Sequence, residues 1–211
     1  MAGEIGICGC PGRTGGGGII RFDRVTFGYP GNPVFADMTY DFPESGCLWL
    51  AGSSGCGKTT LLRLISGLEK PQSGHITGVG RVAMVFQEDR LLPWRSVWDN
   101  ILIATEHPDP ERVEKILGQL GIAEAAGSFP NACSGGMRRR AAIARAMAAE
   151  ADVLLLDEPF TGLDPERKSD TAALLRELYR DRLILLVTHD PGEAEAMGAD
   201  KILNLTIKNP T

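Results

Sequence analysis

A chain of 211 residues with 43% hydrophobic and 23% charged residues is long enough to bury the core of one α/β-sized domain. Its 27 Asp and Glu residues outnumber 22 Lys and Arg residues, and the formal charge of −5 argues against a broad basic face for nucleic acid or a membrane surface. No apolar run approaches the roughly 20 residues that span a bilayer, and residues 1–10 do not read as a secretory signal, so we expect a cytoplasmic protein.

Glycine and cysteine usage exclude two structural classes. Eight of the 26 glycines lie in residues 1–18, where Pro11 is the only proline, so the stretch is predicted to be a flexible extension rather than collagen. The five cysteines are odd in number and form no CxxC pair, which argues against a disulfide framework and against structural zinc. We expect reduced thiols.

Strand signals come first in the chain. Residues 19–45 alternate apolar and polar side chains around turn residues at 29–33, which predicts an antiparallel β unit, and a change of parity between Phe22 and Val25 predicts a bulge or bend. Continuous apolar runs are typical of parallel strands buried on both faces. They lie at residues 47–51, 82–86, 153–156 and 183–187, and a further strand-like stretch follows at 201–205.

Helical signals separate these runs. The pairs Asp109-Pro110 and Asp164-Pro165 each supply an N-cap and a first helical residue, and Leu174, Leu175 and Leu178 are expected to form the inner stripe of the second helix. Residues 88–133 carry helical signal without a parallel-strand run. The sequence therefore predicts an α/β domain over residues 19–211, with a parallel-sheet core, a small N-terminal antiparallel β unit and a helical subdomain at about residues 88–150.

A phosphate-binding loop is predicted between the first parallel strand and a helix. Residues 52–59 fit the pattern G-x-x-x-x-G-K-[ST], in which glycines let backbone amides approach phosphate and the lysine adds a full charge. The hydroxyl of Thr59 can serve Mg²⁺. The alternative is a glycine-rich turn with a stray lysine. The candidate nucleotide-binding residues here are Gly52, Ser53, Ser54, Gly55, Cys56, Gly57, Lys58, Thr59 and Thr60.

Two carboxylates follow a buried strand, at the sheet edge where ligands of open α/β sheets bind. Asp157 can hold hydrated Mg²⁺, and Glu158 is suited to polarise the water that attacks a γ-phosphate. His189, at the end of another apolar strand, can hydrogen-bond a phosphate oxygen. The alternatives are a strand that ends in solvated acids and an ordinary surface or core histidine.

The segment Cys133-Ser134-Gly135-Gly136-Met137 precedes a further helix. Ser134 is a natural N-cap, and the two glycines leave the helix N-terminus open to an anion, although an ordinary capped helix is the alternative. The arginines at positions 138, 139, 140 and 145 are expected to lie mostly on a solvated face.

Taken together, these residues resemble the ATP-binding subunits of ABC transporters. Tyr29 matches the aromatic residue that stacks on adenine, residues 52–59 match Walker A, and Gln87 matches the Q-loop. Residues 133–137 match the signature, and Asp157-Glu158 match the end of Walker B. Residues 161–164 match the D-loop, and His189 matches the switch histidine. The fold that it implies is that of a P-loop NTPase. The segment EDRLLPWRSVWDN is similar to the importer branch for nitrate, sulfonates and taurine.

The resemblance implies a mechanism in two copies of the subunit. ATP is held between the Walker motifs of one subunit and Ser134, Gly135 and Gly136 of the other, and closure drives membrane permease subunits that a solute-binding protein serves. It also implies catalytic roles for Lys58, Gln87, Glu158 and His189, Mg²⁺ ligands at Thr59, Gln87 and Asp157, and a place on the inner face of the cell membrane.

Four departures from the family pattern stand out. Cys133 replaces leucine and Met137 replaces glutamine in the signature, so we expect weaker packing there rather than lost chemistry. Arg139 replaces a frequent glutamine with small expected consequence, and from the end at Thr211 we expect no regulatory C-terminal domain. The alternatives are a soluble ABC-type ATPase and, from another class, a P-loop kinase or a non-hydrolysing module.

Overall fold

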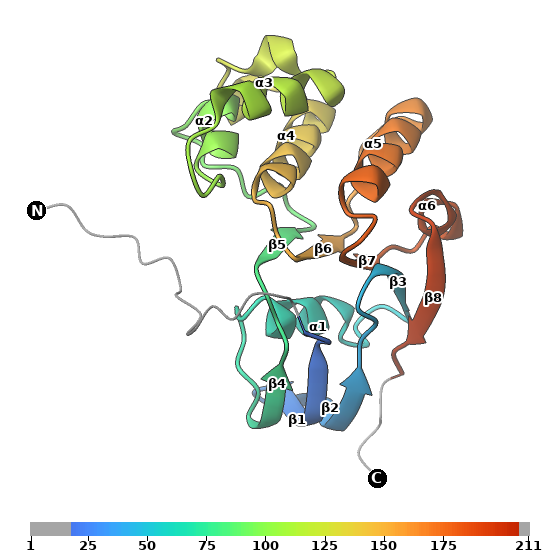
Figure 1. Cartoon of the computed structure of the whole chain (residues 1–211). Coiled ribbons are helices and arrows are strands. Elements are labelled where there is room, and N and C mark those ends of the chain that lie inside the picture. The colour runs from blue at the N-terminus through green and yellow to red at the C-terminus, as the bar shows by residue number, and fades with distance from the viewer. Residues whose placement is uncertain (1–17, 207–211) are drawn as a thin grey trace, which may run out of the picture.

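The computed structural model describes residues 18–206, which form two sheets with helices packed around them (Figure 1). The predicted extension at residues 1–18 lies outside the described residues except for Gly18, and so do Cys8 and Cys10. The three cysteines in the described part, Cys47, Cys56 and Cys133, are buried free thiols.

The larger sheet has five parallel strands in the order β5-β6-β7-β3-β8. The predicted strands are all present, as β3 (Gly46–Ala51), β5 (Val82–Val85), β6 (Val153–Asp157), β7 (Leu183–Val187) and β8 (Ala199–Asn204). Because the strands are parallel, their carboxyl ends meet at one edge. That edge gathers the segments that follow β3, β5, β6 and β7, which carry the predicted Walker A loop, Gln87, Glu158 and His189.

The smaller sheet is antiparallel, in the order β2-β1-β4. Its strands are β1 (Arg21–Tyr29), β2 (Asn32–Asp41) and β4 (Ser73–Thr77). The register of β1 against β2 shifts between Phe22 and Val25, which confirms the predicted bulge. The sequence did not indicate β4, because this five-residue edge strand with Gly74 carries too little apolar alternation to stand out.

The helices begin where cap residues were expected. Asp109 accepts a hydrogen bond from the amide of Arg112 at 3.0 Å, and Asp164 accepts one from Arg167 at 3.0 Å. The helices are α1 (Lys58–Ile65), α2 (Val97–Leu102), α3 (Pro110–Gln119), α4 (Gly135–Ala148), α5 (Pro165–Leu178) and α6 (Pro191–Ala196), with short 3₁₀ turns at Ala123–Ala125 and Pro130–Ala132.

The expected inner stripe of α5 is only partly right. Leu175 is fully buried, but Leu178 is 38% exposed, and Thr171 and Ala172 cover the core instead. The buried face of the helix is therefore formed by Thr171, Ala172 and Leu175.

Two hydrophobic cores lie on opposite faces of the parallel sheet. In β6, Leu154 and Leu156 pack toward the cluster that includes α4 and α5, whereas Val153 and Leu155 pack toward α1. Figure 1 shows α4 and α5 on one side of the sheet and α1 between the sheet and the antiparallel strands. Because both faces are covered, the parallel strands need continuous apolar sequence.

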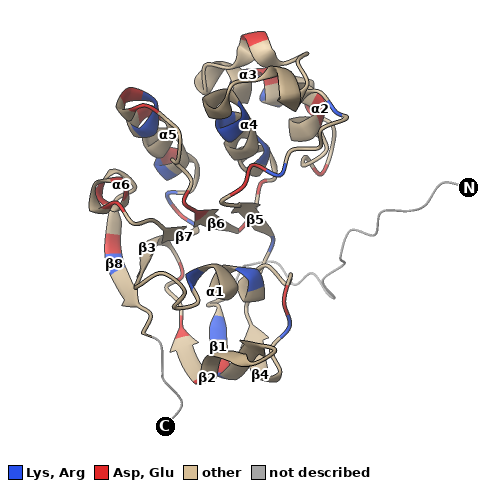
Figure 2. Cartoon of the chain, turned by 180° about the vertical axis from the view of Figure 1, so that it is seen from behind, with Lys and Arg blue, Asp and Glu red and all other residues tan. Residues whose placement is uncertain are grey.

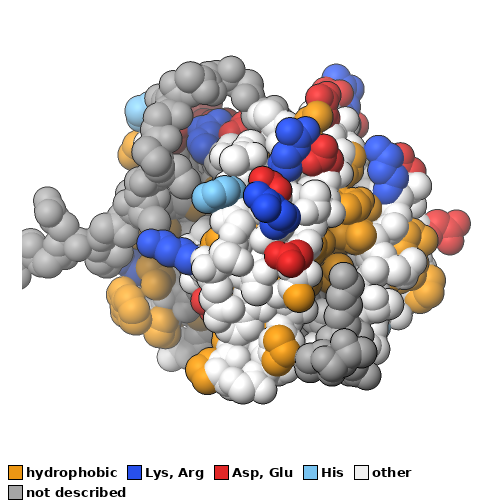
Figure 3. Space-filling model, turned by 90° about the horizontal axis from the view of Figure 1, so that it is seen from below, with side chains coloured by type: hydrophobic (Ala, Val, Ile, Leu, Met, Phe, Trp, Pro, Cys, Tyr) orange, Lys and Arg blue, Asp and Glu red, His pale blue; other side chains and the backbone are white. Residues whose placement is uncertain are grey.

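Surface charge is mixed. Figure 2 shows basic and acidic residues along several helices and strands, and Figure 3 shows their side chains interspersed on the face formed by the antiparallel sheet. One such pair, Arg21 and Asp41, lies at 2.7 Å. Among residues 18–206, no helix has the length and apolar character needed to cross a membrane.

Candidate nucleotide-binding site

The predicted phosphate loop connects β3 to the first turn of α1. Its glycines at 52, 55 and 57 have left-handed φ angles of +146°, +79° and +103°. A Cβ on Gly57 would lie 2.6 Å from Cγ1 of Val34, and one on Gly52 would lie 2.4 Å from the carbonyl oxygen of Leu205. Packing against β2 and the end of β8 therefore requires two of these glycines, in addition to any need of the ligand.

Lys58 is the first residue of α1, directly after the loop glycines, and is 7% exposed. Its Nζ donates hydrogen bonds to the carbonyls of Gly52 (2.8 Å) and Ser53 (2.9 Å). These two contacts curl the loop around the ammonium group and place a positive charge next to the amides at the start of α1. The arrangement suits an anionic ligand.

The loop is joined directly to the end of β6. The hydroxyl of Thr59 donates to Oδ2 of Asp157 at 2.8 Å. Burial raises the pKa of Asp157, and the Thr59 hydrogen bond with the nearby cations Arg63, Arg139 and Lys58 opposes that effect. The hydroxyl of Thr59 and the carboxylate of Asp157 therefore place their oxygen atoms next to each other in the site.

Glu158 lies at the next position, with its carboxylate beside His189. Burial raises the pKa of Glu158, while His189 acts in the opposite direction. Its Oε1 lies 3.5 Å from Nε2 of His189, beyond a good hydrogen bond, and this buried oxygen has no hydrogen-bond partner within the described part of the chain. The imidazole of His189 is 62% exposed. A buried carboxylate oxygen without a hydrogen-bond partner is an atom that a water molecule or substrate hydroxyl would satisfy.

One cleft of about 400 Å³ gathers most of the predicted residues. Along with the carboxylates and the histidine, Tyr29 borders it from the end of β1 and Gln87 from the segment after β5. The hydroxyl of Tyr29 is held by Arg63 Nη1 at 3.3 Å. The other predicted residues that line the cleft are Ser54, Gly55, Gly57, Lys58, Thr59 and Thr60.

Some lining residues were missed. Asn32 and Val34 of β2 and Thr161 after β6 also border the cleft. Thr161 belongs to the segment that resembled a D-loop, so its motif was a usable signal. Asn32 and Val34 carried none, because only the pairing of β2 with β1 brings them beside Tyr29.

The signature residues lie away from this cleft. Ser134 caps α4 by accepting a hydrogen bond from the amide of Met137 at 3.2 Å, but Ser134, Gly135 and Gly136 are not among the residues that line the cleft. Cys133 is 6% exposed, and its thiol donates to the carbonyl of Phe129 at 3.4 Å. The small side chain is thus packed into the core.

The expectation of a solvated arginine face on α4 is wrong for Arg139. Its guanidinium is 2% exposed and donates to backbone carbonyls after β5 and β6. The run AAIARAMAA that follows is apolar apart from Arg145, which indicates that much of the helix is buried but not which of its arginines is. A mostly buried helix forces its polar residues to find partners inside the protein.

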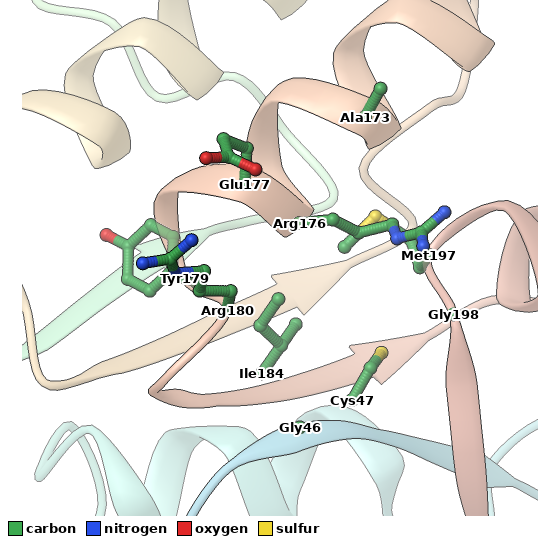
Figure 4. A pocket seen from close by; sticks show the side chains of 10 residues that line it. All are labelled: Gly46, Cys47, Ala173, Arg176, Glu177, Tyr179, Arg180, Ile184, Met197 and Gly198. Carbon is green, nitrogen blue, oxygen red and sulfur yellow. The ribbon is translucent and has the colours of Figure 1, made fainter.

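A second hollow of about 500 Å³ lies at the opposite edge of the parallel sheet, where β3 begins (Figure 4). Cys47, Arg176 and Glu177 line it, but none of the predicted site residues does. Burial raises the pKa of the Cys47 thiol to about 12, so the thiolate needed for nucleophilic chemistry is absent near neutral pH.

Comparison with known proteins agrees with this geometry. A family model described as "ABC transporter" matches residues 35–161. The aliphatic sulfonates import ATP-binding protein of Streptomyces avermitilis is 38% identical over 193 residues, which cover 90% of this chain and 74% of the relative. The protein of the same description from Rhodococcus jostii is 40% identical over 198 residues, 89% of this chain and 80% of the relative.

The fold has a solved counterpart. An ABC transporter of the metal-chelate type, in an inward-facing conformation, superposes with a TM-score of 0.74 and 28% identity over 90% of this chain and 80% of that chain. The same assignment fits the parallel sheet, the antiparallel unit and the order of the motifs along the chain. The chain belongs to the ABC transporter family as an ATP-binding protein.

Proposed function

We propose that this chain binds and hydrolyses ATP as the ATP-binding subunit of an importer for small sulfonate-type solutes. The observation that carries the hydrolytic assignment is the buried, unpaired carboxylate oxygen of Glu158 in the same cleft as Lys58 and Thr59. A buried carboxylate oxygen without a hydrogen-bond partner is costly, so its presence in the cleft favours a role in hydrolysis over nucleotide binding alone.

Binding is the task of the loop and of the end of β1. The amides at 55–60 and the ammonium of Lys58 bind the phosphates of ATP, and the residues at 52–54 and Cys56 shape the loop around them. Tyr29 presents its ring to the adenine, while its hydroxyl stays on Arg63.

The residues that follow β6 and β7, Glu158 and His189, act in hydrolysis. Glu158 accepts the proton of the attacking water as general base, and His189 donates a hydrogen bond to the γ-phosphate. Lys58 offsets the charge that develops on the phosphate oxygens. Gln87 borders the same space and holds the water or the ion in place.

The oxygen donors present fit Mg²⁺. Thr59 and Asp157 supply a hydroxyl and a carboxylate, which are hard oxygen ligands, and Mg²⁺ commonly takes only one or two such protein groups together with waters and phosphates. We assign Thr59, Asp157 and Gln87 as its ligands. When bound, the ion would neutralise charge on the phosphates.

The signature segment acts on a second copy of the chain. Ser134, Gly135 and Gly136 begin α4 with free amides and lie away from the chain's own cleft, so they are available to the γ-phosphate held by a partner subunit. A homodimer then has two sites, each made of two chains. Residues 88–150 act as a helical subdomain that presents this segment.

The importer role rests on the relatives, which are described as aliphatic sulfonates import ATP-binding proteins. We place the chain on the cytoplasmic face of the membrane, bound to permease subunits and served by a solute-binding protein. Co-purification of the full chain with the products of neighbouring genes tests this assignment. Recovery of integral membrane subunits supports it, and recovery of a soluble nucleoprotein instead would favour an ABC ATPase outside transport.

The Glu158→Gln substitution tests the hydrolytic assignment. Loss of the general base is expected to lower kcat by about 10²- to 10⁴-fold, while Mg-ATP still binds and the dimer accumulates. Single-turnover hydrolysis, ATP binding and light scattering measure the three effects. Glu177→Gln is the matched control, because Glu177 is exposed at the opposite hollow, and it should change none of them. Hydrolysis at the parent rate by Glu158→Gln contradicts the assignment.

A further inference from the structure

Arg139 is a buried cation whose contacts none of the roles above explains. It lies on the second turn of α4 and is 2% exposed. Burial lowers the pKa of its guanidinium, and the nearby Asp89 opposes that effect; arginine nevertheless stays charged in proteins. A buried charge persists in a fold where hydrogen bonds replace the lost water, so the partners of Arg139 indicate what it does.

The first set of partners is the backbone around the proposed base. Nε donates to the carbonyl of Pro159 at 2.7 Å. Nη2 donates to the carbonyls of Asp157 (3.1 Å) and Glu158 (2.5 Å). One side chain thus binds three consecutive peptide carbonyls at the end of β6.

The second set lies in the segment after β5. Nη1 donates to the carbonyl of Phe86 at 2.5 Å, and it lies 3.4 Å from the carbonyl of Gln87 and from Oδ1 of Asp89. The planar guanidinium, with donors fixed in a fork, spans both segments at once. A glutamine amide has two N–H groups on one nitrogen and cannot serve both sets.

The backbone of Glu158 explains why such support is needed. Glu158 has φ +49°, in the left-handed region that non-glycine residues seldom occupy. Its amide donates to the carbonyl of Val187 at 2.9 Å, and its carbonyl accepts from Arg139. The unfavourable conformation is therefore held from both sides, and it points the carboxylate toward the cleft instead of along the strand.

We propose that Arg139 is a positioning residue for ATP hydrolysis, which fixes the backbone of Glu158 and keeps it in register with Gln87. The proposal rests on the proposed function, because Glu158 needs positioning as a base only if the chain hydrolyses ATP. Since Arg139 is on α4, the same contacts tie the helix that begins with Ser134 to the hydrolytic carboxylate of its own chain. Arg139 touches no substrate and acts through Glu158.

Arg139→Gln in the full chain tests the proposal. The variant keeps an N–H donor near the position of Nε, but it lacks the guanidinium carbon and both Nη atoms and so releases most of the carbonyls. We expect kcat to fall about 10- to 100-fold while the Kd for ATP changes less than about twofold, because the phosphate loop keeps its own contacts. Arg139→Lys retains the charge as a compact ammonium and should lie between the parent and Arg139→Gln.

Arg145→Gln is the matched control on the same helix. Arg145 donates to the carbonyls of Arg90 (2.7 Å) and Asp89 (3.2 Å), so it also binds the segment after β5, but within the described part of the chain it donates no hydrogen bond to residues 157–159. Its substitution should leave kcat within about twofold of the parent. An equal loss of kcat in Arg145→Gln would mean that general packing of α4, and not the contact with Glu158, sets the rate.

A double-mutant cycle provides a readout that a merely structural role would not move. If Arg139 acts through Glu158, Arg139→Gln should cause no further loss of single-turnover rate in a Glu158→Gln background. A further loss by the same factor, a kcat unchanged in Arg139→Gln, or a parallel rise in Kd would overturn the proposal. If Arg139→Gln does not fold, Arg139→Lys in the same cycle decides. A parent chain without ATPase activity would instead refute the proposed function.

Discussion

The phosphate loop at residues 52–59 and the strand end at residues 157–159 border the same cleft, but different parts of the chain hold them in place. Lys58 binds carbonyls only five and six residues away, at Ser53 and Gly52. The strand end depends on Arg139, about 20 residues away, and on Val187 in a neighbouring strand. The contacts that hold Lys58 are thus local in the chain, whereas the strand end is correct only when α4 and β7 are correctly packed.

Because of this difference, we expect substitutions in the two regions to impair different steps, nucleotide binding and hydrolysis. Damage to the loop should first appear in the affinity for nucleotide, because the loop supplies the charge and the amides that face phosphate. Damage to the strand end should first appear in the rate of hydrolysis, because the proposed role of Glu158 is to act on water and not to bind nucleotide. Lys58→Ala tests this separation directly, and two further predictions concern the stability of the loop and of the strand end.

Lys58→Ala should have the largest effect on binding. Removing a charged hydrogen-bond donor to phosphate costs about 1.5–3 kcal/mol, which corresponds to roughly 10- to 150-fold weaker ATP binding. Calorimetry or a fluorescent nucleotide measures the Kd. Lys70→Ala, an exposed lysine just after α1, is the control and should bind ATP like the parent. Unchanged affinity in Lys58→Ala would remove the phosphate role of Lys58.

Gly57→Ala should destabilise the fold even without nucleotide. The left-handed φ of +103° costs an alanine about 1–2 kcal/mol, and the contact of its Cβ with Val34 at 2.6 Å adds about 1–3 kcal/mol. Urea unfolding without ligand measures the free energy of unfolding. Gly55→Ala is the matched control, because its φ of +79° carries the same strain but its Cβ would meet nothing within 4 Å. Equal losses in the two variants would show that Val34 yields without cost.

The smallest predicted effect is a pH dependence of stability at Glu158. Burial raises its pKa in the folded state, so the protonated form favours folding, and this contribution is lost as the pH rises through the raised pKa. Glu158→Gln cannot ionise and should therefore be more stable than the parent at about pH 8, with little difference at about pH 4. Thermal unfolding at both pH values measures this. A gain in stability that is larger at the acid pH would reverse the sign and contradict the burial argument.

The same contrast between local and long-range contacts explains which features of the fold and the site can be predicted from the sequence. The continuous apolar runs predicted four of the five parallel strands, because strands covered on both faces have no polar side, and the strand-like stretch at 201–205 predicted the edge strand β8. The loop residues were identified with their flanking strand and helix, because the motif carries its own geometry. Both features are local in the chain.

Features that depend on distant segments were not predictable. Strand β4 became visible only through its pairing with β1, and the roles of Asn32 and Val34 in lining the cleft followed from the pairing of β2. Arg139 was expected on a solvated face because a basic triplet usually is solvated. The carbonyls that bind it lie on two other segments, whose approach to α4 is a property of the tertiary fold.

The most direct test is a crossed measurement on two variants of the full chain, Lys58→Ala and Glu158→Gln, in which ATP affinity and single-turnover hydrolysis are measured with Mg²⁺ for both. The separation of binding from hydrolysis predicts that Lys58→Ala mainly raises the Kd, whereas Glu158→Gln keeps the Kd within about twofold and loses at least about 100-fold in rate. If Glu158→Gln binds ATP as poorly as Lys58→Ala, binding and hydrolysis do not depend on separate residues of the cleft. If Glu158→Gln hydrolyses ATP at the parent rate, Glu158 is not the base.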